Sequence, residues 1–169
     1  MSAEKHAELK QRKQHRAAGA VVRRNTMWAV GGSFIPIPVL DNVAIVAVQL
    51  KMLAELSDIY DVPFDRNSGK SAIAALICSL GSGVLGKSLI ATGVFGSMAK
   101  AVPVVGYGLM VLTLPVFNGA TTYALGKIFQ QHFSAGGTIL SFDPGKTEQH
   151  FREKFAEGKE FVTRQKVAA

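Results

Sequence analysis

No acidic residue occurs between Asp65 and Asp143, so 77 consecutive positions carry charge only as Arg66 and four lysines. The other positions are mostly Gly, Ala, Val, Leu, Ile and Phe, with a few polar residues. A soluble domain of this size keeps a surface that is about a quarter charged and mixed in sign. We therefore expect this stretch to be buried in a membrane or against other protein.

The 169 residues predict an all-α protein with one apolar domain between two amphipathic terminal helices. Residues 1–24 contain seven Lys/Arg against two Glu and form a basic N-terminal helical arm with a thin apolar stripe. Residues 25–142 form an apolar helical domain that associates with a membrane and contains a Gly-rich helical hairpin. Residues 143–169 form an amphipathic C-terminal helix, for which Asp143 and Pro144 provide the start.

Proline and glycine mark the turns at the beginning of the apolar domain. The composition changes at Trp28, and two glycines at 31 and 32 argue against a regular helix there. Pro36 and Pro38 then predict an apolar turn, because proline lacks a backbone donor and keeps the preceding residue extended. Asp41 or Asn42 follows as the N-cap of a helix from about 41 to 61.

Two apolar segments follow a polar loop predicted at 62–70. The first, 71–99, is rich in glycine, and the second, 101–126, has 26 residues without a charge. About 20 apolar helical residues cross a membrane, so both segments are long enough. Two prolines within 101–126 make a kinked or re-entrant hairpin as consistent with the sequence as one straight helix. The SAGG sequence at 134–137 predicts the end of the helical run.

The charges that flank the apolar domain predict its orientation. Lys and Arg are in excess on both sides of it. By the positive-inside rule, an even number of crossings then leaves both termini in the cytosol. The predicted location is the bacterial cytoplasmic (inner) membrane, and a single cysteine fits a reducing compartment.

One string in the apolar domain matches a nucleotide-binding motif. Gly81–Ser88 fits G-x-x-x-x-G-K-[ST], in which backbone N–H groups cradle a phosphate. That motif requires a strand before it, whereas the preceding SAIAALICSL is Ala-rich and favours a helix. We therefore interpret the glycines as positions of close helix packing and expect Lys87 to reach a lipid headgroup or a partner.

Other residue patterns do not point to catalysis or to nucleic acid. The four histidines share no metal-ligand spacing, and no Ser/His/Asp or Cys/His grouping indicates a nucleophile. Trp28 is the aromatic residue nearest the basic arm, and no stacking platform for bases follows it. We expect a protein that is not an enzyme, without a cofactor or metal and without a nucleic-acid partner.

The residues expected to contact a membrane or a partner are basic, aromatic or placed in turns. Basic residues attract anionic lipid, Trp and Tyr favour the interface, and the turn residues fix the entry of each helix. The set comprises Arg12, Lys13, Arg16, Arg23, Arg24, Trp28, Pro36, Pro38, Asp41, Lys87, Lys100, Asn118 and Tyr123.

Three motifs resemble the YcjF-like domain-of-unknown-function family 697 over about residues 22–142. They are an I-P-x-P-x-x-D turn ending at Asp41, a K-x-x-P-x-x-G turn from Lys100 to Gly106, and an N-x-x-x-T-Y-A-L-G helix from Asn118 to Gly126. The resemblance implies a helical, membrane-associated module that often accompanies bacterial GTPases. This chain has no GTPase domain, so any nucleotide chemistry would belong to a partner.

Together these features predict a non-catalytic membrane scaffold or regulator that self-assembles and works with a GTPase or a membrane-stress system. Glycine-lined helix faces support the expectation of a homo-oligomer. Two alternatives remain open at this point. One is a membrane-remodelling or pore-forming oligomer, and the other is a soluble, large homo-oligomer that buries its apolar helices between copies.

Overall fold

The computed structural model describes residues 3–32, 40–81 and 105–168, and these ranges contain helices and no strand. This confirms the all-α fold. The elements, in chain order, are α1 (Ala3–Gly32), α2 (Leu40–Ile59), α3 (Arg66–Gly81), α6 (Val105–Ser134), the short 3-10 helix η1 (Ile139–Ser141) and α7 (Pro144–Ala168).

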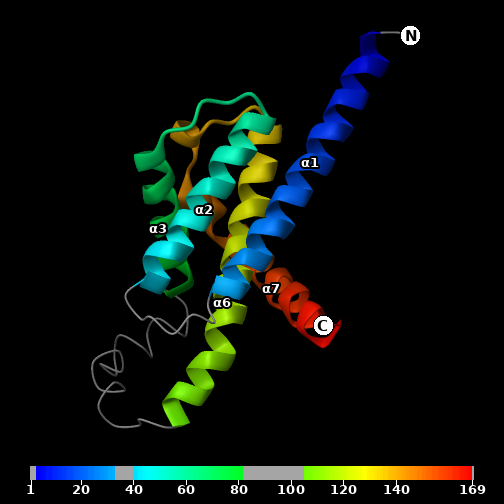
Figure 1. Cartoon of the computed structure of the whole chain (residues 1–169). Helices are drawn as coiled ribbons and strands as arrows, with labels where there is room; N and C mark the ends of the chain where they lie inside the picture. Colours follow the sequence, from blue (N-terminus) through cyan, green and yellow to red (C-terminus); the bar gives the residue numbers. More distant parts are fainter. Residues whose placement is uncertain (1–2, 33–39, 82–104, 169) are drawn as a thin grey trace.

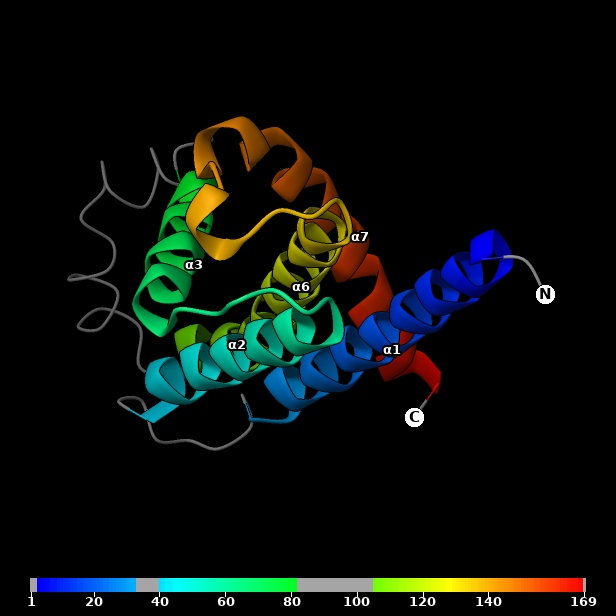
Figure 2. The ribbon, with the colours of Figure 1, turned by 90° about the horizontal axis from the view of Figure 1, so that it is seen from above.

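Helix α6 is the centre of the bundle. Helices α1, α2 and α7 pack against it, and α3 packs between α2 and α7 (Figures 1 and 2). Its residues Leu125, Phe129 and Phe133 are fully or almost fully buried, and Phe151 of α7 joins them in the core. The first turns of α1 extend beyond the other helices, with the N-terminus at the far end (Figure 1).

Three glycines allow the helices around α6 to approach closely. A Cβ on Gly126 would lie 2.7 Å from Val22 of α1, and a Cβ on Gly119 would lie 2.6 Å from Val30. A Cβ on Gly158 of α7 would lie 2.8 Å from the carbonyl oxygen of Ala120. These glycines therefore serve contacts between helices of one chain.

Two predicted helix ends are confirmed. Helix α7 begins at Pro144, and Asp143 Oδ1 accepts hydrogen bonds from the backbone N–H groups of Gly145 (3.0 Å) and Lys146 (3.3 Å). Helix α6 ends at Ser134, and Gly136 has a φ of +83°, a left-handed conformation that glycine adopts without strain. The predicted helix at 41–61 corresponds to α2, which begins at Leu40 and ends at Ile59, so the expected N-cap at 41 or 42 is wrong because both residues lie within the helix.

Two other local predictions are wrong. Helix α1 continues through 25–32 instead of ending near Trp28, because Ala29 and Val30 are buried and this packing outweighs the low helix propensity of two glycines. The expected boundary of the basic arm at 24/25 thus falls inside one helix. Helix α3 begins at Arg66, inside the predicted loop 62–70, because Asp65 caps it: Oδ2 accepts from Ser68 N (2.7 Å) and Oγ (2.6 Å).

The predicted membrane segments lie partly in the described ranges. Helix α6 contains most of 101–126 and runs past Pro115 without interruption, whereas most of 71–99 lies outside the described residues. Within the ranges that the structure covers, no helix is both long enough and apolar enough to cross a membrane.

Candidate functional site

Helix α1 has two faces with opposite character. Its inner face packs on α2 and α6 and includes Val22, Asn25 and Ala29, each at most 2% exposed. Val22 fits against Gly126, and Asn25 Nδ2 donates to the Val21 carbonyl (2.9 Å) and to Glu55 Oε2 of α2 (3.1 Å). This face fixes the rotation of α1 about its axis and thereby determines which residues point outward.

We call the exposed side the outer face of α1; it carries Lys5, Leu9, Arg12, Lys13, Arg16, Arg23 and Met27, all exposed, with Trp28 exposed at its edge. Steps of three, four or seven residues along a helix return to the same side. Four of these cations make no ion pair with another described residue, namely Lys5, Lys13, Arg16 and Arg23. The outer face therefore presents an uncompensated positive charge.

The outer face also carries large apolar side chains. Leu9 is 41% exposed, Met27 43% and Trp28 66%. Only two other large hydrophobic side chains are exposed in the described part of the chain, Phe117 and Leu140. Scattered exposed apolar residues are ordinary, but two on one basic helix face, with a tryptophan at its edge, give it the composition of a membrane-surface helix.

The remaining basic residues of α1 are paired. Arg12 forms a 2.6 Å ion pair with Glu8, and Lys10 lies 3.4 Å from Asp61. Arg24, a predicted contact residue, donates to Glu55 Oε2 of α2 at 2.6 Å, so its described role is to join α1 to α2. This pairing leaves the charge of the outer face concentrated on the four unpaired cations.

Tyr123, another predicted contact residue, lies on α6 and contacts α7. Its ring stacks on Phe161 with centroids 5.2 Å apart, and Lys127 Nζ lies 5.7 Å from the centre of the Tyr123 ring. Burial raises the pKa of the Tyr123 hydroxyl, and the nearby Glu157 raises it further. Burial lowers the pKa of Lys127, and the positive charges of Lys154 and Arg23 lower it further against the opposing effect of Glu157.

The other predicted contact residues fall into two groups. Asn118 is partly buried in α6, and its neighbour Thr122 accepts a buried hydrogen bond from Gln49 Nε2 of α2 at 3.2 Å. Asp41 is the second residue of α2, although its side chain is not described. The residues outside the described ranges are Pro36, Pro38, Lys87 and Lys100, together with most of the Gly81–Ser88 string.

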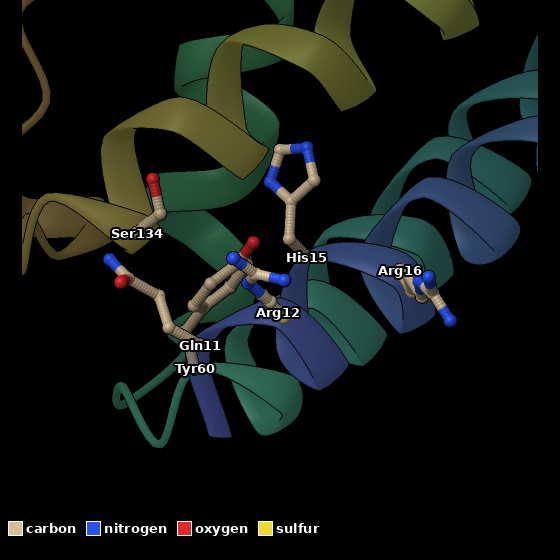
Figure 3. A pocket seen from close by; sticks show the side chains of 6 residues that line it. All are labelled: Gln11, Arg12, His15, Arg16, Tyr60 and Ser134. Carbon is tan, nitrogen blue, oxygen red and sulfur yellow. The ribbon is translucent and has the colours of Figure 1, made fainter. Parts of the chain in front are cut away.

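A shallow hollow of about 390 Å³ lies between α1 and the ends of α2 and α6. Figure 3 shows the six side chains that line it, with Arg16 turned away from the others: Gln11, Arg12, His15, Arg16, Tyr60 and Ser134. Ser134 Oγ donates to the Gln131 carbonyl at 2.8 Å instead of facing a base, so the hollow offers no activated nucleophile. No group of three His, Cys, Asp or Glu that suits a metal occurs among the described residues.

Sequence reasoning found Arg16, Arg23 and Trp28 but missed the face that unites them. The thin apolar stripe of the arm included Leu9, which is exposed on the outer face; Lys5 and Met27 were not singled out. The available signal was the spacing of cations at 5, 12, 16 and 23, which recurs on one side of a helix. Lys127 and Lys154 gave no such signal, because they come from two different helices.

The sequence profile of one protein family, described as "Domain of unknown function (DUF697)", matches residues 1–157. The chain belongs to the DUF697 family. This confirms the resemblance drawn from its three motifs. A curated relative of this DUF697 protein is "Magnetosome membrane protein 22" of Magnetospirillum gryphiswaldense, which is 35% identical over 147 residues, or 87% of this chain and 73% of the relative. No solved structure matches the chain.

Proposed function

We propose that this DUF697 protein is a non-catalytic helical scaffold that docks on an anionic membrane surface through the outer face of α1. The observation that carries the proposal is the alignment of four unpaired cations with the exposed Leu9 and Met27 on one face of a helix, with the exposed Trp28 at the edge of that face. The relative named as a membrane protein supports the same location. We further propose the bacterial inner membrane, with both termini in the cytosol.

The chemistry of the outer face fits a phospholipid surface. Each Lys or Arg near an anionic leaflet contributes about 1 kcal/mol of attraction. Leu9, Met27 and Trp28 can then enter the headgroup region, where tryptophan is particularly favoured. Because α1 is already held on α2 and α6, binding requires no folding of a free peptide.

The scaffold role also includes partners. Family resemblance to modules that accompany bacterial GTPases supports a GTPase partner, to which nucleotide chemistry would belong. We also propose that the protein self-associates on the membrane. Light scattering coupled to size exclusion, with and without lipid, tests self-association; a monomer under both conditions contradicts it.

Vesicle binding tests the proposed docking. The purified protein is sedimented with phosphatidylcholine vesicles, with or without phosphatidylglycerol. We expect binding that requires phosphatidylglycerol and weakens with salt, because exposed charges are screened. Removing Lys5, Lys13 and Arg16 together by substitution with Gln should weaken binding by about 3 kcal/mol, or about a hundredfold.

A matched control removes three cations from other helices. The variant Lys70→Gln, Lys146→Gln and Arg164→Gln has the same net charge but leaves the outer face intact, since these residues lie on α3 and α7. We expect it to bind almost as tightly as the wild type. An equal loss of vesicle binding in both triple variants would show that net charge alone causes the effect and would overturn the assignment to α1.

A further inference from the structure

The positive charges of Arg23 on α1 and Lys154 on α7 act on Lys127 of α6, which lies beside the Tyr123 ring. Arg23 follows Val22, which fits against Gly126, and Lys127 is the next residue after that glycine. Lys154 lies one turn before Gly158, which fits against Ala120 and Tyr123. The close glycine contacts therefore bring α1, α6 and α7 together at these three positions. We call them the three-helix cluster: Arg23, Lys127 and Lys154.

The three-helix cluster is not neutralised by its surroundings. Lys154 is only 19% exposed and pairs with Glu157 at 2.6 Å, which is the acidic side chain that acts on Lys127. Arg23 forms no ion pair within the described residues, and Lys127 contacts the face of the Tyr123 ring. Three positive charges against one negative charge leave two uncompensated, at a site where Lys127 is partly buried. Such an arrangement is unfavourable without an anion.

We propose that Arg23, Lys127 and Lys154 bind a phosphate group, with Tyr123 and Phe161 as the apolar wall of the site. A phosphate accepts several charge-assisted hydrogen bonds, and its double negative charge matches the charge of the cluster. The guanidinium of Arg23 can bind two oxygens at once, while the ammonium groups act as point charges. The phosphate comes from a phosphomonoester lipid headgroup or from solution.

Arg23 belongs to the outer face of α1 as well, so the site adjoins the proposed membrane surface. For a lipid headgroup, the inference rests on the proposed function, because the bilayer would have to lie along α1. Phosphatidic acid supplies a phosphomonoester, whereas phosphatidylglycerol supplies a diester with a single charge. If the phosphate comes from a lipid, the protein should prefer phosphatidic acid to phosphatidylglycerol, and attraction to an anionic surface alone does not predict this preference.

The test uses the full chain, its Lys127→Gln and Arg23→Gln variants, and Lys70→Gln as the control. Inorganic phosphate, compared with chloride at equal ionic strength, should raise the melting temperature of the wild type and of Lys70→Gln but of neither cluster variant. Lys127→Gln should itself melt higher than the wild type without phosphate, since it removes a repelled cation. Phosphatidic acid vesicles should bind the wild type about tenfold more tightly than phosphatidylglycerol vesicles, and the variants should lose this preference.

The outcomes separate the two proposals. Phosphate stabilisation without a lipid preference assigns the site to a soluble phosphate, and both effects together assign it to a headgroup. Neither effect, with phosphatidylglycerol binding intact, overturns the phosphate site and leaves the docking face. If the wild type does not bind phosphatidylglycerol vesicles, the docking face is overturned, while the melting temperature in phosphate still tests the three-helix cluster.

Discussion

The inner and outer faces of α1 belong to one helix, but the inner face is packed against other helices and the outer face is exposed and charged. On the inner face Val22 approaches Gly126 so closely that no Cβ fits between them. On the outer face Lys13 and Arg16 touch no acidic partner among the described residues. The difference indicates that the inner face determines stability and position, whereas the outer face is free to change without unfolding the protein and serves binding.

The largest effect should follow charge reversal on the outer face. The double variant Lys13→Glu and Arg16→Glu replaces two attractive charges by two repulsive ones, at about 2 kcal/mol each. We expect a loss of about a thousandfold or more in affinity for phosphatidylglycerol vesicles, measured by flotation. The free energy of unfolding in urea should change by less than about 0.5 kcal/mol. A large loss of stability would contradict the claim that outer-face residues serve binding and do not determine stability.

The inner face should give the converse result. Gly126→Ala places a methyl group 2.7 Å from Val22 and 3.0 Å from Met52 Sδ, and overpacking of this kind costs about 1–3 kcal/mol. Gly19→Ala is the matched control on α1, because nothing lies within 4 Å of its Cβ. It should gain up to about 1 kcal/mol from helix propensity. Urea unfolding measures both changes.

A double-mutant cycle tests the cause of the loss at Gly126. Adding Val22→Ala should recover part of the stability that Gly126→Ala removes, because the smaller side chain makes room for the new methyl group. Strictly additive losses would show that the contact between α1 and α6 is not the origin of the effect.

A smaller gain is expected at Thr26, on the inner face. Its side chain is fully buried, and its hydroxyl oxygen has no hydrogen-bond partner among the described residues. Thr26→Val keeps the shape and removes the unpaired oxygen, so the free energy of unfolding should rise by about 1 kcal/mol. Thr163→Val on α7, where the exposed hydroxyl donates to the Lys159 carbonyl, serves as the control and should not stabilise. A loss at Thr26 would indicate a bound partner for its hydroxyl.

The smallest effect lies outside both faces, at the start of α7. The backbone N–H group of Lys146 holds the pKa of Asp143 below its ordinary value, with a further contribution from the Lys146 side chain. A lowered carboxyl pKa stabilises the folded state above the unfolded value of about 4, and this stability is lost as the pH falls through the folded pKa. Asp143→Asn should therefore reduce the difference in melting temperature between neutral and acidic pH. An unchanged pH dependence would contradict the role of the ionised cap.

Local signals were sufficient for some elements and insufficient for others. The start of α7 and the end of α6 were predictable, because Asp143–Pro144 and SAGG act within a few residues. The continuation of α1 through Gly31 and Gly32 was not, because it depends on contacts with a helix about 90 residues further along the chain. The exposure of Leu9 beside the burial of Val22 was not predictable for the same reason: a thin apolar stripe does not determine which side packs until the partner helix is known.

The glycines show a second limit of prediction from sequence. The glycines at 81–96 suggested contacts between copies of the chain, and most of them lie outside the described residues; Gly119, Gly126 and Gly158 contact helices of the same chain. Sequence indicates that a small residue permits close approach, but it does not indicate which helix approaches. The three-helix cluster could not be predicted for the same reason, since the sequence does not indicate that α1, α6 and α7 approach one another at these glycines.

The most direct test of the docking face uses Trp28, the single tryptophan of the chain, which is 66% exposed. Its fluorescence reports the environment at the edge of the outer face without a label. With phosphatidylglycerol vesicles we expect the emission to shift to shorter wavelength and to be quenched by lipid-borne quenchers, and with phosphatidylcholine vesicles to stay unchanged. An unshifted emission while the protein sediments with phosphatidylglycerol vesicles would contradict docking through α1.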